Sequence, residues 1–261
     1  MARQVDAKGG HRFPVFIVGS PRSGTSMLHW ALCEHEELWG SEESELLPTF
    51  TRHLESVYNE ARRFKGRNWL ETQQVDLEAF FAYLGTGIDA LYASRAGKRH
   101  WLEQTPSNTW ALPEIYRMFP DARFLFIHRD GRQVVESMIS MWHWNFVKAV
   151  KTWEDANRLA MHFERNHPGA TLRIAYEKLV THPEQELRRI WQFLGLDECR
   201  DSIRFIVDKE PINVSPRFKD PDRLKKLEPR YRHWSWYKRF LFRRIAVEQM
   251  ESLGYKQFRA R

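Results

Sequence analysis

The fold of this chain is decided by the stretch Gly19-Ser20-Pro21-Arg22-Ser23-Gly24-Thr25-Ser26-Met27-Leu28. It follows a short apolar run, residues 15–18, and opens a segment with helical spacing. A strand, a glycine-bounded loop and a helix N-terminus together form an anion site, because backbone N–H groups converge there and the helix dipole favours negative charge. We therefore predict a strand over about 14–18, a phosphate-binding loop, and a helix over about 24–35 with Ser23 available as its N-cap.

The loop is close to a nucleotide-binding motif but departs from it at one position. Gly19 and Gly24 have the spacing of a Walker A loop, G-x-x-x-x-G-K-[ST]. Thr25 stands where that motif has its lysine, and Arg22 brings a fixed positive charge into the loop itself. We therefore expect the loop to hold a phosphate, but not the β- and γ-phosphates of a nucleoside triphosphate.

Length and composition are those of a globular protein. The 261 residues are 42% hydrophobic and 29% charged, and a chain of this size buries roughly 70–75% of its unfolded surface. We predict one domain over 1–261, with residues 1–12 flexible. Cys33 and Cys199 are too few for a disulfide framework or a zinc site. The sequence shows no secretory signal and no apolar run of ~20 residues, which predicts a cytoplasmic protein without a membrane span.

The net charge of +7 suits anionic ligands but does not choose among them. The basic residues are scattered and no recognition module is present, so we expect no nucleic-acid partner. No pair of histidines has ligand spacing joined to a carboxylate, so we expect no metal. A homodimer is left open.

Predicted strands and helices alternate along the chain, without an internal repeat. The strands cover about 14–18, 38–40, 99–103, 123–128 and 172–175, and the helices about 24–35, 46–62, 75–95, 131–144, 152–166, 182–194 and 236–252. A capping box at Thr181–Glu184 begins one helix, and Gly195 and Gly254 end two others. The pattern predicts an α/β fold with a central parallel sheet flanked by helices. Ligands of such folds bind at the carboxyl ends of the strands.

A second anion site is predicted where the strand over 123–128 ends. Arg129 leaves this strand, Asp130 caps the next helix, and Ser137 lies two turns into that helix. An arginine beside a hydroxyl can bind a phosphate through charge-assisted hydrogen bonds. Taken alone, Arg129 and Asp130 fit equally well a pair that fixes the strand-to-helix corner. Two anion sites at neighbouring strand ends predict one ligand with phosphates at both ends.

These segments together resemble the sulfotransferase family, most closely the tyrosylprotein sulfotransferases and related bacterial enzymes. The resemblance is carried by residues 21–26 and by residues 129–132 with Ser137; weaker matches are Glu42-Glu43 with Pro48, residues 176–179 and residues 253–255. It implies a nucleotide-kinase-like, P-loop-like fold. It also implies transfer of a sulfuryl group from 3′-phosphoadenosine 5′-phosphosulfate (PAPS) to an acceptor hydroxyl, without a metal. The product nucleotide is 3′-phosphoadenosine 5′-phosphate (PAP).

The resemblance also assigns roles to individual residues. It gives the 5′-phosphosulfate to Arg22, Ser23, Gly24, Thr25 and Ser26, the 3′-phosphate to Arg129 and Ser137, and the nucleotide's surroundings to Tyr176, Ser215 and Arg217. Arg22 is expected to stabilise the leaving phosphate. The catalytic base falls on Glu43, with Glu42 as its rival; the alternative reading of both is an exposed acidic helix start. A catalytic role for His29 or His143 is less favoured than a structural or surface one.

One departure from the family concerns Gln104, because many members carry a lysine there that stabilises the departing group. Glutamine donates a hydrogen bond but brings no charge. Either Arg22 acts alone, or Lys219 or Arg217 replaces the lysine, or turnover is weak. The acceptor is left open between a glycan, a phenol or tyrosine, and a small alcohol. The alternative functions are a non-catalytic PAPS- or nucleotide-binding protein and a P-loop-type nucleotide kinase.

Overall fold

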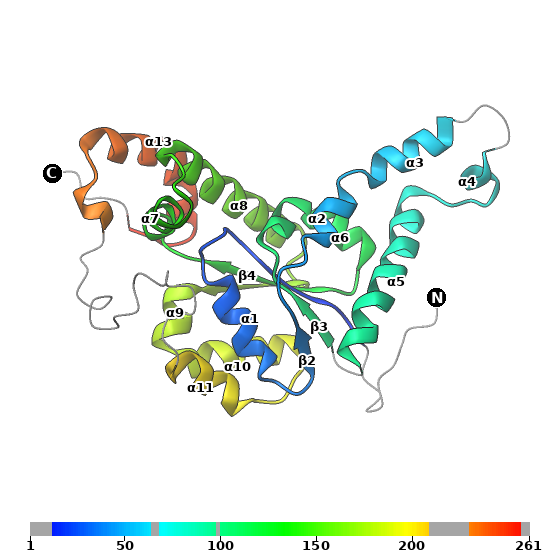
Figure 1. The fold of residues 1–261 in the computed structure, drawn as a ribbon, viewed down its shortest axis with the longest axis horizontal. Helices are drawn as coiled ribbons and strands as arrows, with labels where there is room; N and C mark the ends of the chain where they lie inside the picture. Colours follow the sequence, from blue (N-terminus) through cyan, green and yellow to red (C-terminus); the bar gives the residue numbers. More distant parts are fainter. Residues whose placement is uncertain (1–11, 64–67, 98–99, 209–229, 257–261) are drawn as a thin grey trace.

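The computed structural model describes residues 12–63, 68–97, 100–208 and 230–256. Ser215, Arg217 and Lys219 lie outside the described residues, as does the predicted flexible segment apart from Arg12. At the centre is a five-stranded parallel sheet in the order β2-β3-β1-β4-β5 (Figure 1). Its strands are β1 (Val15–Val18), β2 (Leu38–Gly40), β3 (His100–Glu103), β4 (Arg123–His128) and β5 (Thr171–Ala175). The predicted α/β fold class is confirmed.

The middle strand β1 pairs with β3 on one side and with β4 on the other. All four of its residues are buried. A parallel strand covered on both faces has no polar face, and this is why β1 and β4 appear in the sequence as continuous apolar runs. The chain segments that follow β1 and β4 therefore leave the same edge of the sheet side by side.

Two hydrophobic cores lie on opposite faces of the sheet. Val15 and Ile17 of β1 pack with α1 (Thr25–Cys33), α9 (Tyr176–Thr181), α10 (Pro183–Leu194) and α11 (Arg200–Asp208). Phe16 and Val18 of the same strand pack with α5 (Leu77–Ala96), α6 (Leu112–Met118), α7 (Gly131–Trp142), α8 (Phe146–Asn166) and α13 (Trp236–Ser252). Alternate residues of a strand point to opposite faces, so one short strand contributes to both cores.

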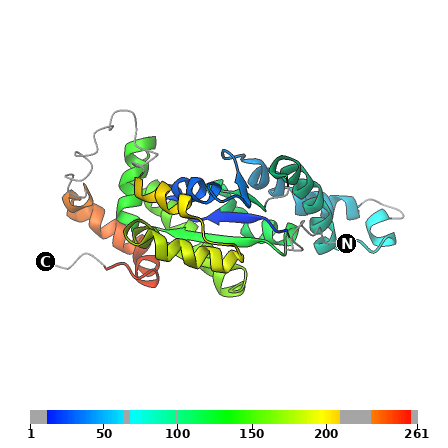
Figure 2. The ribbon, with the colours of Figure 1, turned by 90° about the horizontal axis from the view of Figure 1, so that it is seen from below.

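The remaining elements extend the molecule along its long axis. They are α2 (Leu46–Thr51), α3 (Leu54–Arg63), α4 (Trp69–Thr72), and the 3₁₀ helices η1 (Pro106–Ala111) and η3 (Arg230–His233). In both views α3 and α4 project from one end of the sheet, whereas α13 lies at the opposite end (Figures 1 and 2). None of the helices in the described ranges is long and apolar enough to cross a membrane.

Three local predictions are wrong. The helix predicted over 46–62 is divided into α2 and α3. Ser23 does not cap α1; Gly24 occupies the N-cap in a left-handed conformation, without a side-chain hydrogen bond. Thr181 is not part of a capping box, because its hydroxyl bonds to the Glu177 carbonyl in the preceding turn and Pro183 begins α10. The left-handed glycine caps at Gly195 and Gly254 are confirmed.

Candidate active site

The loop after β1 requires glycine at both ends. A Cβ on Gly19 would lie 2.1 Å from the Ile127 carbonyl oxygen of β4, and a Cβ on Gly24 would lie 2.4 Å from the Tyr176 ring. Both glycines have positive φ, 143° and 101°. The loop therefore lies tightly against the neighbouring strand, and its backbone leads directly into the N-terminus of α1 at Thr25.

A buried hydroxyl inside this loop has no protein partner. Ser23 is fully buried, and its Oγ makes no hydrogen bond with any residue that the structure describes. An unsatisfied buried hydroxyl costs free energy, so it marks a place where a bound polar group completes the site. Thr109 of η1 fixes the other end of the loop: its Oγ1 accepts from the Gly19 N–H at 2.9 Å and lies 3.0 Å from the Gly19 carbonyl oxygen.

Arg22 joins the two predicted anion sites. Its Nε donates to the Ser137 Oγ on α7 at 3.0 Å, and its guanidinium lies 5.9 Å from the centre of the exposed Trp142 ring. Burial lowers the pKa of Arg22, and the nearby charge of Arg129 lowers it further, whereas Glu43 raises it. Arginine keeps its charge through such shifts, so two cations share this edge of the sheet.

The guanidinium of Arg129 lies over the Tyr176 ring, and its Nε–H donor has no hydrogen-bond partner in the ranges that the structure describes. Its guanidinium is 4.3 Å from the centre of the Tyr176 ring, and its Nη2 donates to the Gln133 Oε1 at 2.9 Å. Its buried Nε has no hydrogen-bond partner among the described residues. Asp130 pairs with Arg132 instead, accepting from Nε at 2.9 Å, and it caps α7. The alternative reading of Arg129 as the partner of Asp130 is therefore wrong.

A buried polar cluster supports the chain on either side of Arg129. The hydroxyl of Tyr255 donates to Glu177 at 2.8 Å, and His128 Nδ1 lies 2.9 Å from the same hydroxyl. The other carboxylate oxygen of Glu177 accepts from the Asp130 N–H at 3.0 Å. Burial lowers the pKa of His128 to about 3. The ring is therefore neutral, and its Nδ1–H can donate to the Tyr255 hydroxyl.

Glu43 follows β2, accepts a hydrogen bond from Gln104, and lies within range of the charge of Arg22. The Gln104 Nε2 donates to Glu43 Oε1 at 3.4 Å. Burial raises the pKa of Glu43, as do the charges of Glu45 and Glu103; the Gln104 hydrogen bond and the charge of Arg22 oppose this rise. Gln104 is 4% exposed, and its Oε1 has no partner within the described ranges.

The segment that carries Glu43 is held by a carboxylate that the sequence did not single out. Glu103, at the end of β3, is 3% exposed. It accepts hydrogen bonds from the Ser44 hydroxyl at 3.2 Å, from the N–H and hydroxyl of Thr105, and from the Asn108 amide. The Thr105 Oγ1 in turn accepts from the Ser44 N–H at 3.1 Å. This network ties the segment around Ser44 to the sheet edge.

Of the two histidines considered for catalysis, His29 packs against Gly40 and lies near Ser41 and Glu42, just before Glu43. His29 is buried in α1, with its Nε2 3.6 Å from the Cys33 Sγ, and burial lowers its pKa to about 4. His143 is exposed and caps the C-terminus of α7 in a left-handed conformation. In the described part of the chain, no group of three His, Cys, Asp or Glu side chains is placed to hold a metal ion.

Comparison with known proteins decides the family. Residues 14–201 match the family model described as the sulfotransferase family. The chain belongs to this family. The protein-tyrosine sulfotransferase 2 of Gallus gallus is 29% identical over 192 residues, which covers 70% of this chain and 51% of the relative. This sulfotransferase spans 50% to 65% of the length of the first curated relatives that it matches.

Solved structures show the same fold. The sulfotransferase domain of the Synechococcus PCC 7002 olefin synthase superposes with a TM-score of 0.64 at 21% identity, covering 98% of this chain and all of the domain. A mouse sulfotransferase in complex with PAP superposes with a TM-score of 0.58 at 16% identity, and the match covers 92% of this chain and 84% of the mouse protein. The predicted family resemblance is confirmed.

Proposed function

We propose that this sulfotransferase transfers the sulfuryl group of PAPS to an acceptor hydroxyl, with Glu43 as the base. The observation that carries this proposal is the contact of Arg22 with Ser137, because it joins two anion sites on the neighbouring strands β1 and β4. One ligand with a phosphate group at each end fits such a pair of sites. The PAP complex of the structurally similar mouse sulfotransferase supports this choice of nucleotide.

The unpaired polar groups indicate how each phosphate is held. The loop N–H groups of residues 24–26 and the Ser23 hydroxyl would bind the 5′-phosphosulfate at the N-terminus of α1. The unused Nε of Arg129, together with Ser137, would bind the 3′-phosphate. Tyr176 supports Arg129 from the face of its guanidinium. Ser215 and Arg217 keep their predicted role near the nucleotide.

The reaction needs a base on one side of sulfur and positive charge on the other. The acceptor oxygen forms a bond to sulfur while the bond from sulfur to the phosphate oxygen breaks, and the acceptor proton passes to Glu43. The raised pKa of Glu43 makes it a stronger base than an ordinary glutamate. Arg22 and the loop N–H groups stabilise the negative charge that develops on the leaving phosphate.

Gln104 takes a different role from the lysine of other family members. It donates to Glu43, so it orients the base rather than stabilising the leaving phosphate. The cation of the lysine is then supplied by Arg22, which lies near both Arg129 and Glu43. A non-catalytic nucleotide-binding protein is the second candidate, because Gln104 brings no charge.

Thermal shift and binding measurements test the donor. We expect PAP to raise the Tm far more than ATP with Mg²⁺ does.

Arg129→Ala should weaken PAP binding about 50-fold and 5′-AMP binding little, because a lost charged hydrogen bond costs on the order of 2–3 kcal/mol. Arg204→Ala is the matched control, since this arginine of α11 is exposed and far along the chain from the loop. An equal loss for both nucleotides would contradict the 3′-phosphate role of Arg129.

A further inference from the structure

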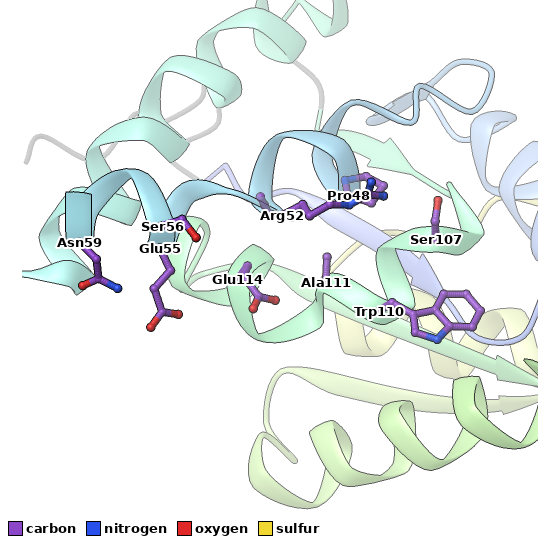
Figure 3. Close-up of a pocket in the computed structure, with 10 residues that line it drawn as sticks. Pro48, Arg52, Glu55, Ser56, Asn59, Ser107, Trp110, Ala111 and Glu114 are labelled. Carbon is purple, nitrogen blue, oxygen red and sulfur yellow. The ribbon is translucent and has the colours of Figure 1, made fainter. Parts of the chain in front are cut away.

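A groove of about 610 Å³ runs between α2 and α3 on one side and η1 and α6 on the other (Figure 3). It begins beside Ser107 and Trp110 and extends past Arg52 toward Asn59, with the Glu55 and Glu114 side chains projecting between these ends. No part of the donor loop lines it. The groove is therefore separate from both anion sites.

The groove lies next to the proposed base. The Ser107 hydroxyl at its inner end donates to Glu45 Oε2 at 2.6 Å, and Glu45 is two residues beyond Glu43. The helix η1 connects the two sites: Thr109 bonds to Gly19 of the donor loop, while its neighbour Trp110 faces the groove. A ligand in the groove therefore lies beside the segment that carries the base.

The chemistry of the lining argues against one of the acceptor classes considered above, the phenol or tyrosine. Seven of its ten residues are polar or charged, so the groove offers no enclosed apolar slot for a phenol. Three carboxylates, Glu55, Glu114 and Glu45 at the inner end, face two cations, Arg52 and Arg117, the latter 3.8 Å from Glu55. A peptide rich in acidic residues would meet like charge there.

The lining of the groove is suited to a sugar. Trp110 is 43% exposed and offers a flat indole surface on which the apolar face of a sugar ring can stack. Carboxylate, amide and hydroxyl groups around it can hydrogen-bond to sugar hydroxyls. Pockets that combine an aromatic surface with a few placed polar groups are typical ligand sites.

We propose that this groove binds the acceptor, and that the acceptor is a neutral or amino-bearing sugar whose ring stacks on Trp110. The inference rests on the proposed function. The sugar hydroxyl supplies the oxygen that bonds to sulfur, its proton passes to Glu43, and the phosphate of PAPS leaves as PAP. Trp110 is a specificity-determining residue that touches the acceptor and does not touch the donor.

Four acceptors test the proposal with [³⁵S]PAPS: an N-acetylglucosamine trisaccharide, its de-N-acetylated cationic form, an acidic tyrosine peptide and 2-naphthol. We expect transfer to the saccharides. Trp110→Ala should raise the KM for the saccharides about fivefold to tenfold, with little change in kcat, because an aromatic contact is worth about 1 kcal/mol. Trp236→Ala, an exposed tryptophan at the start of α13, is the matched control and should change nothing.

Transfer to the peptide or to 2-naphthol with an unchanged KM in Trp110→Ala would overturn the proposal. So would the absence of saccharide binding in saturation-transfer NMR with PAP present. The PAP-induced Tm shift, measured in parallel, should persist in Trp110→Ala. If the wild-type protein shows no such shift, the proposed function fails on its own, and the NMR titration repeated without nucleotide still decides whether the groove binds the trisaccharide.

Discussion

Arg22 and Glu43 are the two residues on which the proposed chemistry depends, and their environments differ in a useful way. Arg22 is partly buried among groups that also include a second cation, Arg129. Glu43 is exposed on its solvent side, but burial of its carboxylate and two neighbouring acids raise its pKa. Burial and like charges thus act on both groups: they lower the pKa of Arg22, the proposed cation for the leaving phosphate, and raise the pKa of Glu43, the proposed base.

Substitution of the base tests this residue directly. Glu43→Gln should leave the PAP-induced Tm shift intact and lower sulfuryl transfer at least about 100-fold, because a glutamine cannot accept the acceptor proton. The adjacent Glu42→Gln is the matched control, since Glu42 has the same charge and exposure class but no hydrogen bond to Gln104. Transfer measured with radiolabelled PAPS decides between them: an active Glu43→Gln enzyme moves the base elsewhere.

At the scale of elements, the C-terminal end of the described chain supports the segment that carries Arg129, the proposed 3′-phosphate ligand. Tyr255, three residues beyond α13, reaches Glu177 of α9 and His128 of β4. Glu177 in turn holds the N–H that follows Arg129. Three elements that are distant in sequence thus fix the backbone on which Arg129 stands, and Tyr255 acts through this cluster as a positioning residue.

Removal of the Tyr255 hydroxyl tests this support. Tyr255→Phe leaves one oxygen of Glu177 without its donor, so we expect a loss of about 1–3 kcal/mol in unfolding free energy. Because the backbone beside Arg129 loosens, the Kd for PAP should rise while that for 5′-AMP stays near its wild-type value. Tyr237→Phe, on the exposed face of α13, is the control. Equal nucleotide affinities in Tyr255→Phe and the wild type would leave Tyr255 a structural residue alone.

The elements that the sequence predicted well are those whose residues, within one short stretch of the chain, determine the local backbone structure. Residues 15–18 of β1 and 124–127 of β4 are apolar because both faces are covered, and Gly195 and Gly254 end their helices because the left-handed conformation favours glycine. The loop at residues 19–24 was identified from glycine spacing, and Arg129 and Ser137 from the strand end and helix start at residues 128–131; the family resemblance assigned them the 3′-phosphate. Each of these features is written in a few consecutive residues.

The parts that the sequence did not predict depend on contacts across long separations. Glu103 looked like the polar end of a strand, yet it holds Ser44, 59 residues away. Thr109 reaches Gly19 across 90 residues, and Tyr255 reaches Glu177 across 78. No periodicity or spacing reports such pairs, because the fold alone brings them together. The groove beside Trp110 was missed for the same reason.

For the molecule as a whole, two buried histidines make stability depend on pH. The pKa of His29 is lowered to about 4 and that of His128 to about 3, mainly by burial. The unfolded chain binds protons at these rings near pH 6.5, whereas the folded state does not until the pH falls much further. Stability is therefore highest above the unfolded pKa and declines as the pH falls below it.

This decline can be measured by chemical unfolding. Between about pH 7.5 and about pH 5, each histidine should remove on the order of 2 kcal/mol of unfolding free energy. His128→Asn keeps a donor near Nδ1 and removes the titrating group, so its stability should decline less steeply; His53→Asn, at an exposed position, should follow the wild type. Identical slopes in His128→Asn and the wild type would contradict this origin of the acid sensitivity.

The backbone of Arg22 has a consequence for how this protein can change under selection. Its φ is 69°, a left-handed conformation that costs a residue with a side chain roughly 1 kcal/mol and costs glycine almost nothing. Folding alone would thus favour glycine at position 22. Arg22→Gly would remove this backbone cost, and with it the charge that the proposed function places between the two predicted anion sites. Position 22 is therefore one where backbone stability and the proposed activity are in conflict.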